Sequence, residues 1–120
     1  ITSVILPETL TSLGTYTFMG CNKLGTIRVE CAEIPDFCFV QCGLTNLTLS
    51  HNVKKIGSNI LNYTTLKELT YEGSLEDWTS VTKYSNWDQN LDNSGLRKVI
   101  CLDGYMEYDS ENREWKMVKE

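Results

Sequence analysis

The chain has 120 residues, of which 41% are hydrophobic and 22% charged, and its net charge is −5. Length and composition predict one globular unit and exclude an intrinsically disordered chain. The first 71 residues carry equal numbers of acids and bases, so the whole net charge lies in residues 72–120. No basic stripe and no apolar run of roughly 20 residues is present, so we expect neither nucleic-acid binding nor membrane insertion.

An apolar pattern recurs about every twenty residues, which is typical of a repeat solenoid. Ile1–Lys23 forms the first repeat, in which Val4 and Leu6 face inward from a short strand that ends at Pro7. The pattern is clearest in Leu44–Thr65. Its apolar positions there are Leu44, Leu47, Leu49, Val53, Ile56 and Leu61, and Gly57 follows directly after Ile56.

Three further segments continue the pattern after residue 23. We place the second repeat at 24–43, the third at 44–65, the fourth at 66–95 and a closing strand at 96–101. The fourth repeat departs from the others after Tyr71, and we predict no second strand in it. Ser74 and Asp77 instead fit a helix N-terminus with acids in the first turn, which predicts a short helix near Ser74–Val81.

Residues 105–120 are predicted to cap the 1–104 repeat region with a β-hairpin. Its strands, Tyr105–Tyr108 and Arg113–Val118, flank a four-residue loop. The register that this loop favours sets Glu107 against Glu114. The side chains expected together on one face are Met106, Tyr108, Trp115 and Met117.

Two stretches, ITSVILPETLTSLGTYTFMGCNKL and LTNLTLSHNVKKIGSNIL, resemble BspA-like leucine-rich repeats of bacterial surface proteins. That family favours a proline after the strand, an isoleucine–glycine corner, an alanine–phenylalanine pair and a cysteine. The end of the array, Tyr71–Trp78 followed by Val99–Gly104, is similar to the way such arrays end. Departures from the family pattern are Pro35 for glycine, Cys38 and Ile60 for alanine, and Leu61 for phenylalanine.

The resemblance covers about residues 1–104 and implies an α/β-type solenoid. Such a solenoid is expected to be a right-handed superhelix with a short parallel β-ladder and short helical turns. The resemblance also implies a non-catalytic, adhesin-like module of a secreted or cell-surface protein, which binds another protein such as a host surface or matrix protein. It implies no cofactor and no catalytic residue.

The outward rows of the ladder are the candidate protein-binding surface, because alternate side chains of a strand point away from the core. Arg28 is the expected centre of binding, since its planar fork of donors suits protein interfaces. We expect Arg28→Ala with Asn46→Ala to lower the affinity for a partner without changing the melting temperature. The candidate residues are Thr26, Arg28, Asn46, Thr48, Glu68, Thr70 and Lys98.

Other chemistries remain as alternatives. A small hydrolase would have to use His51, the only histidine. A zinc site of Cys31, Cys38, Cys42 and His51 has suitable ligand types, but its spacing fits no paired CxxC pattern, and we expect no metal site. Because five cysteines cannot all pair, we expect buried free thiols at the repeat positions Cys21, Cys42 and Cys101.

Acidic and aromatic residues have structural interpretations that compete with functional ones. Glu72, Glu76 and Asp77 lack the alternating ligands of a calcium loop and suit the start of a helix. Trp78 and Trp115 suit the core or the cap better than a sugar-binding platform.

The first residue already stands within the repeat pattern, so we expect the chain to be a fragment of a longer secreted protein, located outside the cell or at its surface. The upstream edge would leave Leu10, Leu13 and Phe18 partly uncovered, a surface that favours self-association. A structural spacer that presents another domain is the alternative to a binding module.

Overall fold

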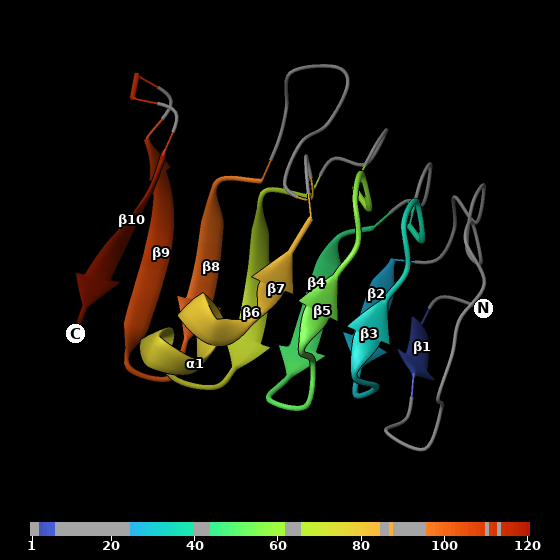
Figure 1. The fold of residues 1–120 in the computed structure, drawn as a ribbon. Helices are drawn as coiled ribbons and strands as arrows, with labels where there is room; N and C mark the ends of the chain where they lie inside the picture. The colour runs from blue at the N-terminus through green and yellow to red at the C-terminus, as the bar shows by residue number, and fades with distance from the viewer. Residues whose placement is uncertain are drawn as a thin grey trace.

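The fold consists of a large sheet and a small sheet packed against one core (Figure 1). A computed structural model describes residues 3–6, 25–39, 44–61, 66–84, 87, 96–109, 111–112 and 114–120. Within them, seven strands form the large sheet in the order β1-β2-β4-β6-β8-β9-β10, and three form the small sheet in the order β3-β5-β7. The elements are β1 (Ser3–Leu6), β2 (Thr26–Val29), β3 (Glu33–Ile34), β4 (Asn46–Ser50), β5 (Lys55–Ile56), β6 (Glu68–Glu72), α1 (Leu75–Ser80), β7 (Thr82–Lys83), β8 (Lys98–Cys101), β9 (Gly104–Asp109) and β10 (Glu114–Lys119).

The predicted parallel ladder is confirmed by the first five strands of the large sheet. β1, β2, β4, β6 and β8 pair in parallel, each with the corresponding strand of the next repeat. Alternate side chains of β2, β4, β6 and β8 point into the core because successive residues of a strand face opposite sides. The buried ones are Ile27, Val29, Leu47, Leu49, Leu69, Tyr71, Val99 and Cys101.

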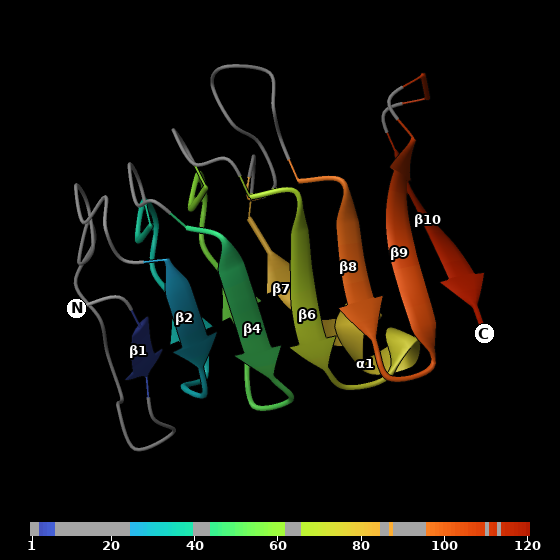
Figure 2. The same ribbon diagram turned by 180° about the vertical axis from the view of Figure 1, so that it is seen from behind.

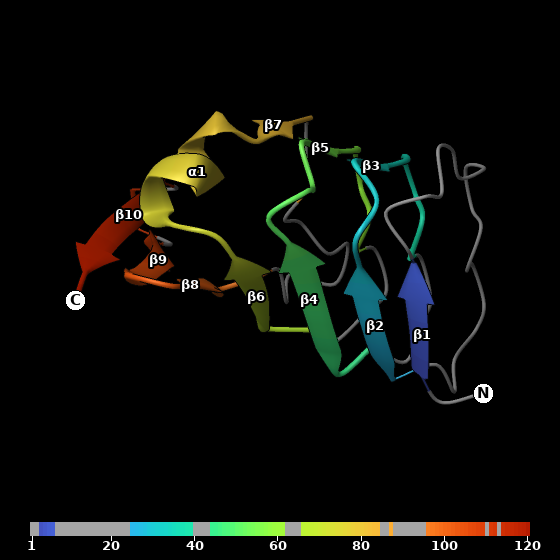
Figure 3. The same ribbon diagram turned by 90° about the horizontal axis from the view of Figure 1, so that it is seen from below.

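The small sheet forms a second layer behind the ladder (Figure 3). Each of its strands has two residues, and the buried corner residues Ile34 and Ile56 pair across it. The prediction that the fourth repeat has no second strand is wrong, because β7 pairs in parallel with β5. The strand comes late in the sequence: α1 is inserted between β6 and β7, so Thr82 occupies the place beside Lys55.

Successive repeats are locked together at the corner after the small-sheet strand. Asp36 Oδ1 accepts a hydrogen bond of 2.8 Å from the backbone N–H of Ser58, and Phe37 N–H donates to Ser58 O at 3.0 Å. Phe37 and Asn59, which hold the same position in their repeats, both have left-handed backbone angles, with φ of 57° and 54°. Gly57 is required here, because a Cβ atom at this position would lie 2.6 Å from backbone atoms of the preceding repeat.

The predicted helix is confirmed as α1, which lies beside the core at the C-terminal end of the small sheet. The Ser74 side chain caps it by accepting from Asp77 N–H at 3.0 Å, and the acids Glu76 and Asp77 lie in its first turn. Its buried side chains are those of Leu75 and Trp78. It is the one helix in the described part of the chain.

The C-terminal hairpin extends the large sheet beyond β8 (Figure 2). Its facing set Met106, Tyr108, Trp115 and Met117 is confirmed, since Met117 pairs with Met106 and Trp115 with Tyr108.

The predicted register of the hairpin is wrong, because Glu107 pairs with Lys116 and not with Glu114. β9 continues through Asp109, so the connection between the strands begins one residue later than predicted. The observed register gives Glu107 an opposite charge across the ladder. It sets Asp109 beside Glu114, and the ion pair of Asp109 with Lys116 offsets that like-charge contact.

Aromatic rings close the core at this end. Trp78 contacts Tyr71 and Trp87 with ring centroids 5.2 and 5.6 Å apart, and Trp87 stacks on Trp115 at 5.8 Å. Trp115 also contacts Tyr108 at 5.4 Å. Trp78 and Trp87 are buried and Trp115 is half-buried, so these rings join the fourth repeat to the hairpin.

Candidate protein-binding face

The outward side chains of β2, β4, β6 and β8 form one surface, here called the ladder face, which is turned toward the viewer in Figure 2. The backbone register places its residues in two rows. Thr26 pairs with Asn46 in one row, and Glu68 with Lys98 further along it. The second row runs through Arg28, Thr48, Thr70 and Ile100.

All seven sequence-predicted residues therefore lie on this face, but they differ in accessibility. Thr26, Asn46, Glu68 and Thr70 are exposed, whereas Arg28, Thr48 and Lys98 are half-buried. The apolar Ile100 adds an exposed side chain at the far end of the second row. Strand alternation predicts its outward direction, but Ile100 was not among the candidate residues.

Arg28 is held by two carboxylates of its own chain. Its Nη1 and Nη2 atoms donate to Glu72 Oε2 and Oε1 at 2.9 and 2.6 Å, and its Nε donates to Glu30 Oε2 at 2.8 Å. The interaction crosses β4, because Arg28 lies on β2 and Glu72 ends β6. These hydrogen bonds raise the pKa of Arg28 and hold the pKa of Glu72 below its ordinary value.

This network changes what Arg28 can do. Three of its five N–H donors are bonded to Glu30 and Glu72, so the guanidinium links the second repeat to the fourth before it meets any partner. Replacing Arg28 would leave two acids without their cation. We therefore expect the double change Arg28→Ala with Asn46→Ala to lower the melting temperature as well, which revises the expectation drawn from the sequence. The sequence contains a weak signal for this, since Glu72 lies two residues after Thr70 on the outward side of the same strand.

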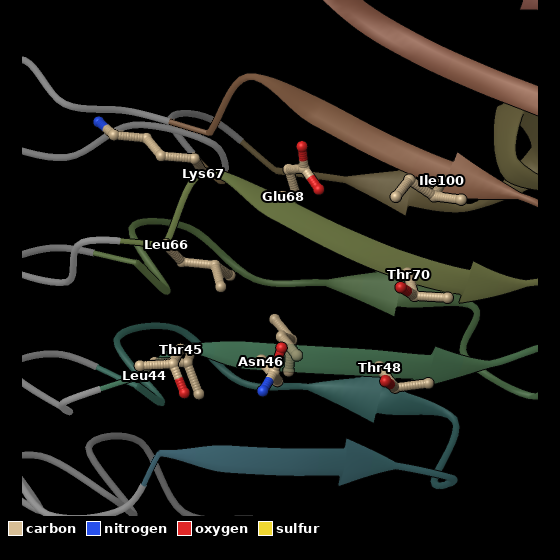
Figure 4. A pocket seen from close by; sticks show the side chains of 10 residues that line it. Leu44, Thr45, Asn46, Thr48, Leu66, Lys67, Glu68, Thr70 and Ile100 are labelled. Atoms are coloured by element: carbon tan, nitrogen blue, oxygen red, sulfur yellow. The ribbon is translucent and has the colours of Figure 1, made fainter.

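A groove of about 370 Å³ opens in the ladder face between β4 and β6 (Figure 4). Among the described residues, the β4–β6 pairing begins at Thr48 and Thr70, whereas the β2–β4 pairing already begins at Thr26 and Asn46. The two strands thus separate at their N-terminal ends. The groove is lined by Leu44, Thr45, Asn46, Leu47, Thr48, Leu66, Lys67, Glu68, Thr70 and Ile100.

The groove combines an apolar floor with a polar rim. Leu44, Leu47 and Leu66 are almost fully buried and belong to the core. Asn46 and Glu68 stand on opposite sides of the opening, each at the first residue of its strand (Figure 4). A partner side chain placed in the groove meets amide and carboxylate groups at the rim, and the apolar surface that it can contact comes from the exposed Ile100.

The far end of the ladder face is cationic and aromatic. Lys98 Nζ lies 4.2 Å from the ring centre of Tyr105, and Lys98 pairs with Glu107 across β8 and β9. Arg97 lies over Tyr108 at 5.7 Å. Lys98 thus contributes to the hairpin contact as well as to the ladder face.

The residues of the alternative chemistries lie apart from this face. His51 is exposed in the turn after β4, whereas the side chains of Cys31 and Cys38 are buried. Cys101 is a buried free thiol, as predicted, and burial raises its pKa to about 11. Within the described residues, no group of three or more His, Cys, Asp or Glu side chains is placed to hold a metal ion. Other predicted positions lie outside the described residues; they are Leu10, Leu13, Phe18, Cys21 and Cys42.

Parallel strands of similar sequence, stacked repeat on repeat with a grooved outward face, define a repeat protein of the leucine-rich class. Residues 1–93 match the family described as BspA type leucine rich repeat region (6 copies). The match spans more than half of the chain, and the chain belongs to this family, which confirms the resemblance read from the sequence. Regions of this class commonly mediate contacts between proteins.

Two other comparisons add no relative. Neither the curated proteins nor the solved structures contain a match to the chain. No helix in the described part of the structure has the length and apolar character needed to cross a membrane.

Proposed function

We propose that the chain is a non-catalytic module that binds another protein through its ladder face, with the groove between β4 and β6 at the centre of the contact. The groove is the observation that carries the proposal. It interrupts an otherwise regular sheet surface, and its polar rim together with the exposed Ile100 offers the mixture of polar and apolar contacts found in protein interfaces. The exposed residues Asn46, Glu68 and Thr70 line it, and Thr26 lies beside Asn46 on the next strand.

The shape of the face favours a protein over a small metabolite. Neighbouring strands lie roughly 4.8 Å apart, so the rows of β2, β4, β6 and β8 extend across about 14 Å of open surface. A surface of this kind suits a protein edge or an extended segment, whereas small-molecule sites enclose most of their ligand. We propose a secreted or cell-surface setting and an adhesin-like role toward a host surface or matrix protein, in keeping with the family. Winding of the repeats into a right-handed solenoid is part of the same proposal.

Thr70→Arg tests the groove, because Thr70 is exposed and an arginine there would fill the opening without entering the core. The matched control is Thr82→Arg in β7, an exposed threonine of the small sheet on the opposite layer. Both variants and the parent are passed over surfaces coated with individual purified matrix proteins, and binding is measured by surface plasmon resonance.

We expect Thr70→Arg to weaken binding about thirtyfold, which corresponds to the loss of a typical interface hot spot, and Thr82→Arg to leave it unchanged. Equal binding by Thr70→Arg and the parent would exclude the groove. Binding by none of the three, with folding intact, would favour the structural spacer. A hydrolase screen that compares the parent with His51→Ala addresses the enzymatic alternative.

A further inference from the structure

The last strand of the large sheet has an open edge. β10 pairs with β9 on one side, and no segment in the described part of the chain borders its other side (Figures 1 and 2). An exposed strand edge carries backbone donors and acceptors that can pair with a strand of another chain. The strand contains no proline, and Met117 within it is 48% exposed.

The hydrogen bonds of the hairpin show which residues face the open edge. Glu120 N–H donates to Asp103 O at 2.9 Å, and these two residues continue the β9–β10 register. In an antiparallel pair the hydrogen-bonded positions alternate, so Lys116 and Val118 also direct their backbone groups toward β9. The backbone groups of Trp115, Met117 and Lys119 therefore point outward.

One face of β10 carries the side chains of Lys116, Val118 and Glu120, which are a cation, an apolar group and an anion in chain order. An antiparallel copy of the strand presents these groups in the reverse order, so that each cation can meet an anion. If a second copy pairs antiparallel with its two-fold axis at Val118, Lys116 lies opposite Glu120 of that copy, and the same pair recurs on the other side of the axis. Met117 then pairs with Lys119, and each such pair exchanges both backbone hydrogen bonds.

Neighbouring registers that keep the outward backbone groups aligned lack this match. An axis at Met117 places Glu114 against Glu120, and an axis at Lys116 or Lys119 places that lysine against itself. An axis at Trp115 pairs Glu114 with Lys116 but overlaps β10 only at its beginning. Lysines on an edge strand ordinarily oppose pairing, and the register at Val118 is the longest one in which Lys116 meets an acid.

We propose that β10 is a self-association edge, at which two copies of this chain pair through antiparallel β10 strands around a two-fold axis at Val118. The two large sheets then form one continuous sheet. Lys116 keeps its own ion pair with Asp109, 3.0 Å between Nζ and Oδ2, because its side chain is more than half exposed and has donors for both acids.

The pairing has a consequence for binding that rests on the proposed function. The two-fold axis stands perpendicular to the sheet, so both ladder faces point to the same side. A dimer would thus present two grooves to one surface, and a surface with repeated binding sites would be held more tightly than by a single copy.

A charge exchange tests the register directly. Lys116→Glu and Glu120→Lys are each prepared as a separate protein. Within either one, the axis at Val118 sets like charges against each other twice. In an equimolar mixture, the heterodimer sets the introduced glutamate of the first variant against the introduced lysine of the second. Its other charge pair joins the native Glu120 of the first variant to the native Lys116 of the second.

Sedimentation velocity over a concentration series gives the dissociation constants. We expect the parent to dimerise, each variant alone to associate about tenfold more weakly, and the mixture to regain the parent value. Glu114→Lys is the matched control and should dimerise like the parent, because the charge pairs of this register are made by residues 116 and 120. Met117→Pro should abolish association while leaving the hairpin paired, since the N–H it removes points outward.

Three results would overturn the proposal: a parent that stays monomeric at millimolar concentration, a mixture that associates no better than its components, or dimers that persist in both charge variants and in Met117→Pro. The last result would place association at another edge of the molecule. None of these outcomes depends on whether the groove binds a partner, because the ladder face is not covered in the dimer.

Discussion

The guanidinium of Arg28 on β2 reaches over β4 and forms two hydrogen bonds, of 2.9 and 2.6 Å, with the carboxylate of Glu72 at the end of β6. The two residues are 44 positions apart in the sequence and belong to repeats that are not neighbours. A contact of this range resists the separation of three consecutive repeats, whereas most contacts in a repeat protein join adjacent ones.

Acid should weaken the contact between Arg28 and Glu72 and so lower the folding stability. In Glu72→Gln this pH dependence should be absent. The pKa of Glu72 is lowered in the folded state from its ordinary value of 4.5, chiefly by the hydrogen bonds from Arg28. A lowered pKa gives stability that is present above pH 4.5 and is lost as the pH falls through the folded-state pKa. The contribution should stay below about 1 kcal/mol, because the side chains are 34% and 38% exposed and solvent screens the pair.

The measurement is the melting temperature of the parent and of Glu72→Gln between about pH 6 and pH 3. The difference between them should narrow on acidification. Glu68→Gln, on the same strand, is the control. Asp109 has a folded-state pKa of about 2, set by Lys116 and Asn112. The stability that this carboxylate contributes is therefore lost as the pH falls toward that value, and it gives the melting temperatures of both proteins the same additional pH dependence. A constant difference across the range would contradict the assignment.

Gly57→Ala should destabilise the fold by about 2 kcal/mol or more, because the new methyl group overlaps backbone that cannot move independently. Its Cβ would lie 2.6 Å from Pro35 C and from Asp36 N. Ser58→Ala is the matched control, since the bond from residue 58 to Asp36 uses the backbone N–H and survives the change. Urea unfolding followed by circular dichroism measures both, and equal midpoints would show that the corner has room.

Trp115→Ala should loosen the hairpin from the repeat core. The ring stacks on Trp87 with an interplanar angle of 26° and also contacts Tyr108, so its removal uncovers the aromatic end of the core. We expect a loss of about 2 kcal/mol, less than for a fully buried tryptophan. Met117→Ala, on the same face but 48% exposed, should cost much less. Thermal unfolding decides the matter, and similar losses in the two variants would exclude a special role for the stack.

The cysteines should react slowly with a thiol reagent in the native protein and completely after denaturation. Cys31, Cys38 and Cys101 are buried, and burial raises the pKa of Cys31 and takes that of Cys101 to about 11, so little thiolate forms at neutral pH. Labelling without reductant in denaturant should count all five cysteines. A count of three or one would reveal disulfides, and rapid native labelling of Cys101 would show that the end of the core is open.

Sequence pattern predicted the parts of the fold that depend on local periodicity. Leu47, Leu49 and Ile56 are buried because their spacing fixes both the strand and its inward face. The helix at Leu75–Ser80 followed from one capping serine and two acids. Where a feature depends on the residue at which a connection begins or ends, as with β7 and with the hairpin register, local pattern was not enough.

The candidate site was predictable as a surface but not as a shape. Alternation alone placed Thr26, Asn46 and Thr70 outward. The groove arises because β4 and β6 begin to pair only at Thr48 and Thr70, a tertiary detail with no counterpart in the spacing of apolar residues. The internal ion pair of Arg28 was missed for the same reason, because its partner comes from two repeats away.

The late position of β7 in the sequence shows how a chain of this kind can accept an insertion. Ladder partners are 20 residues apart between β2 and β4, 22 between β4 and β6, and 30 between β6 and β8, yet every strand keeps its place in the parallel ladder. The excursion after Glu72 is absorbed by α1 before Thr82 rejoins the small sheet. Insertion length and strand register are thus independent at this junction, so genetic insertion or loop grafting after β6 can add a new surface while the neighbouring repeats stay in register.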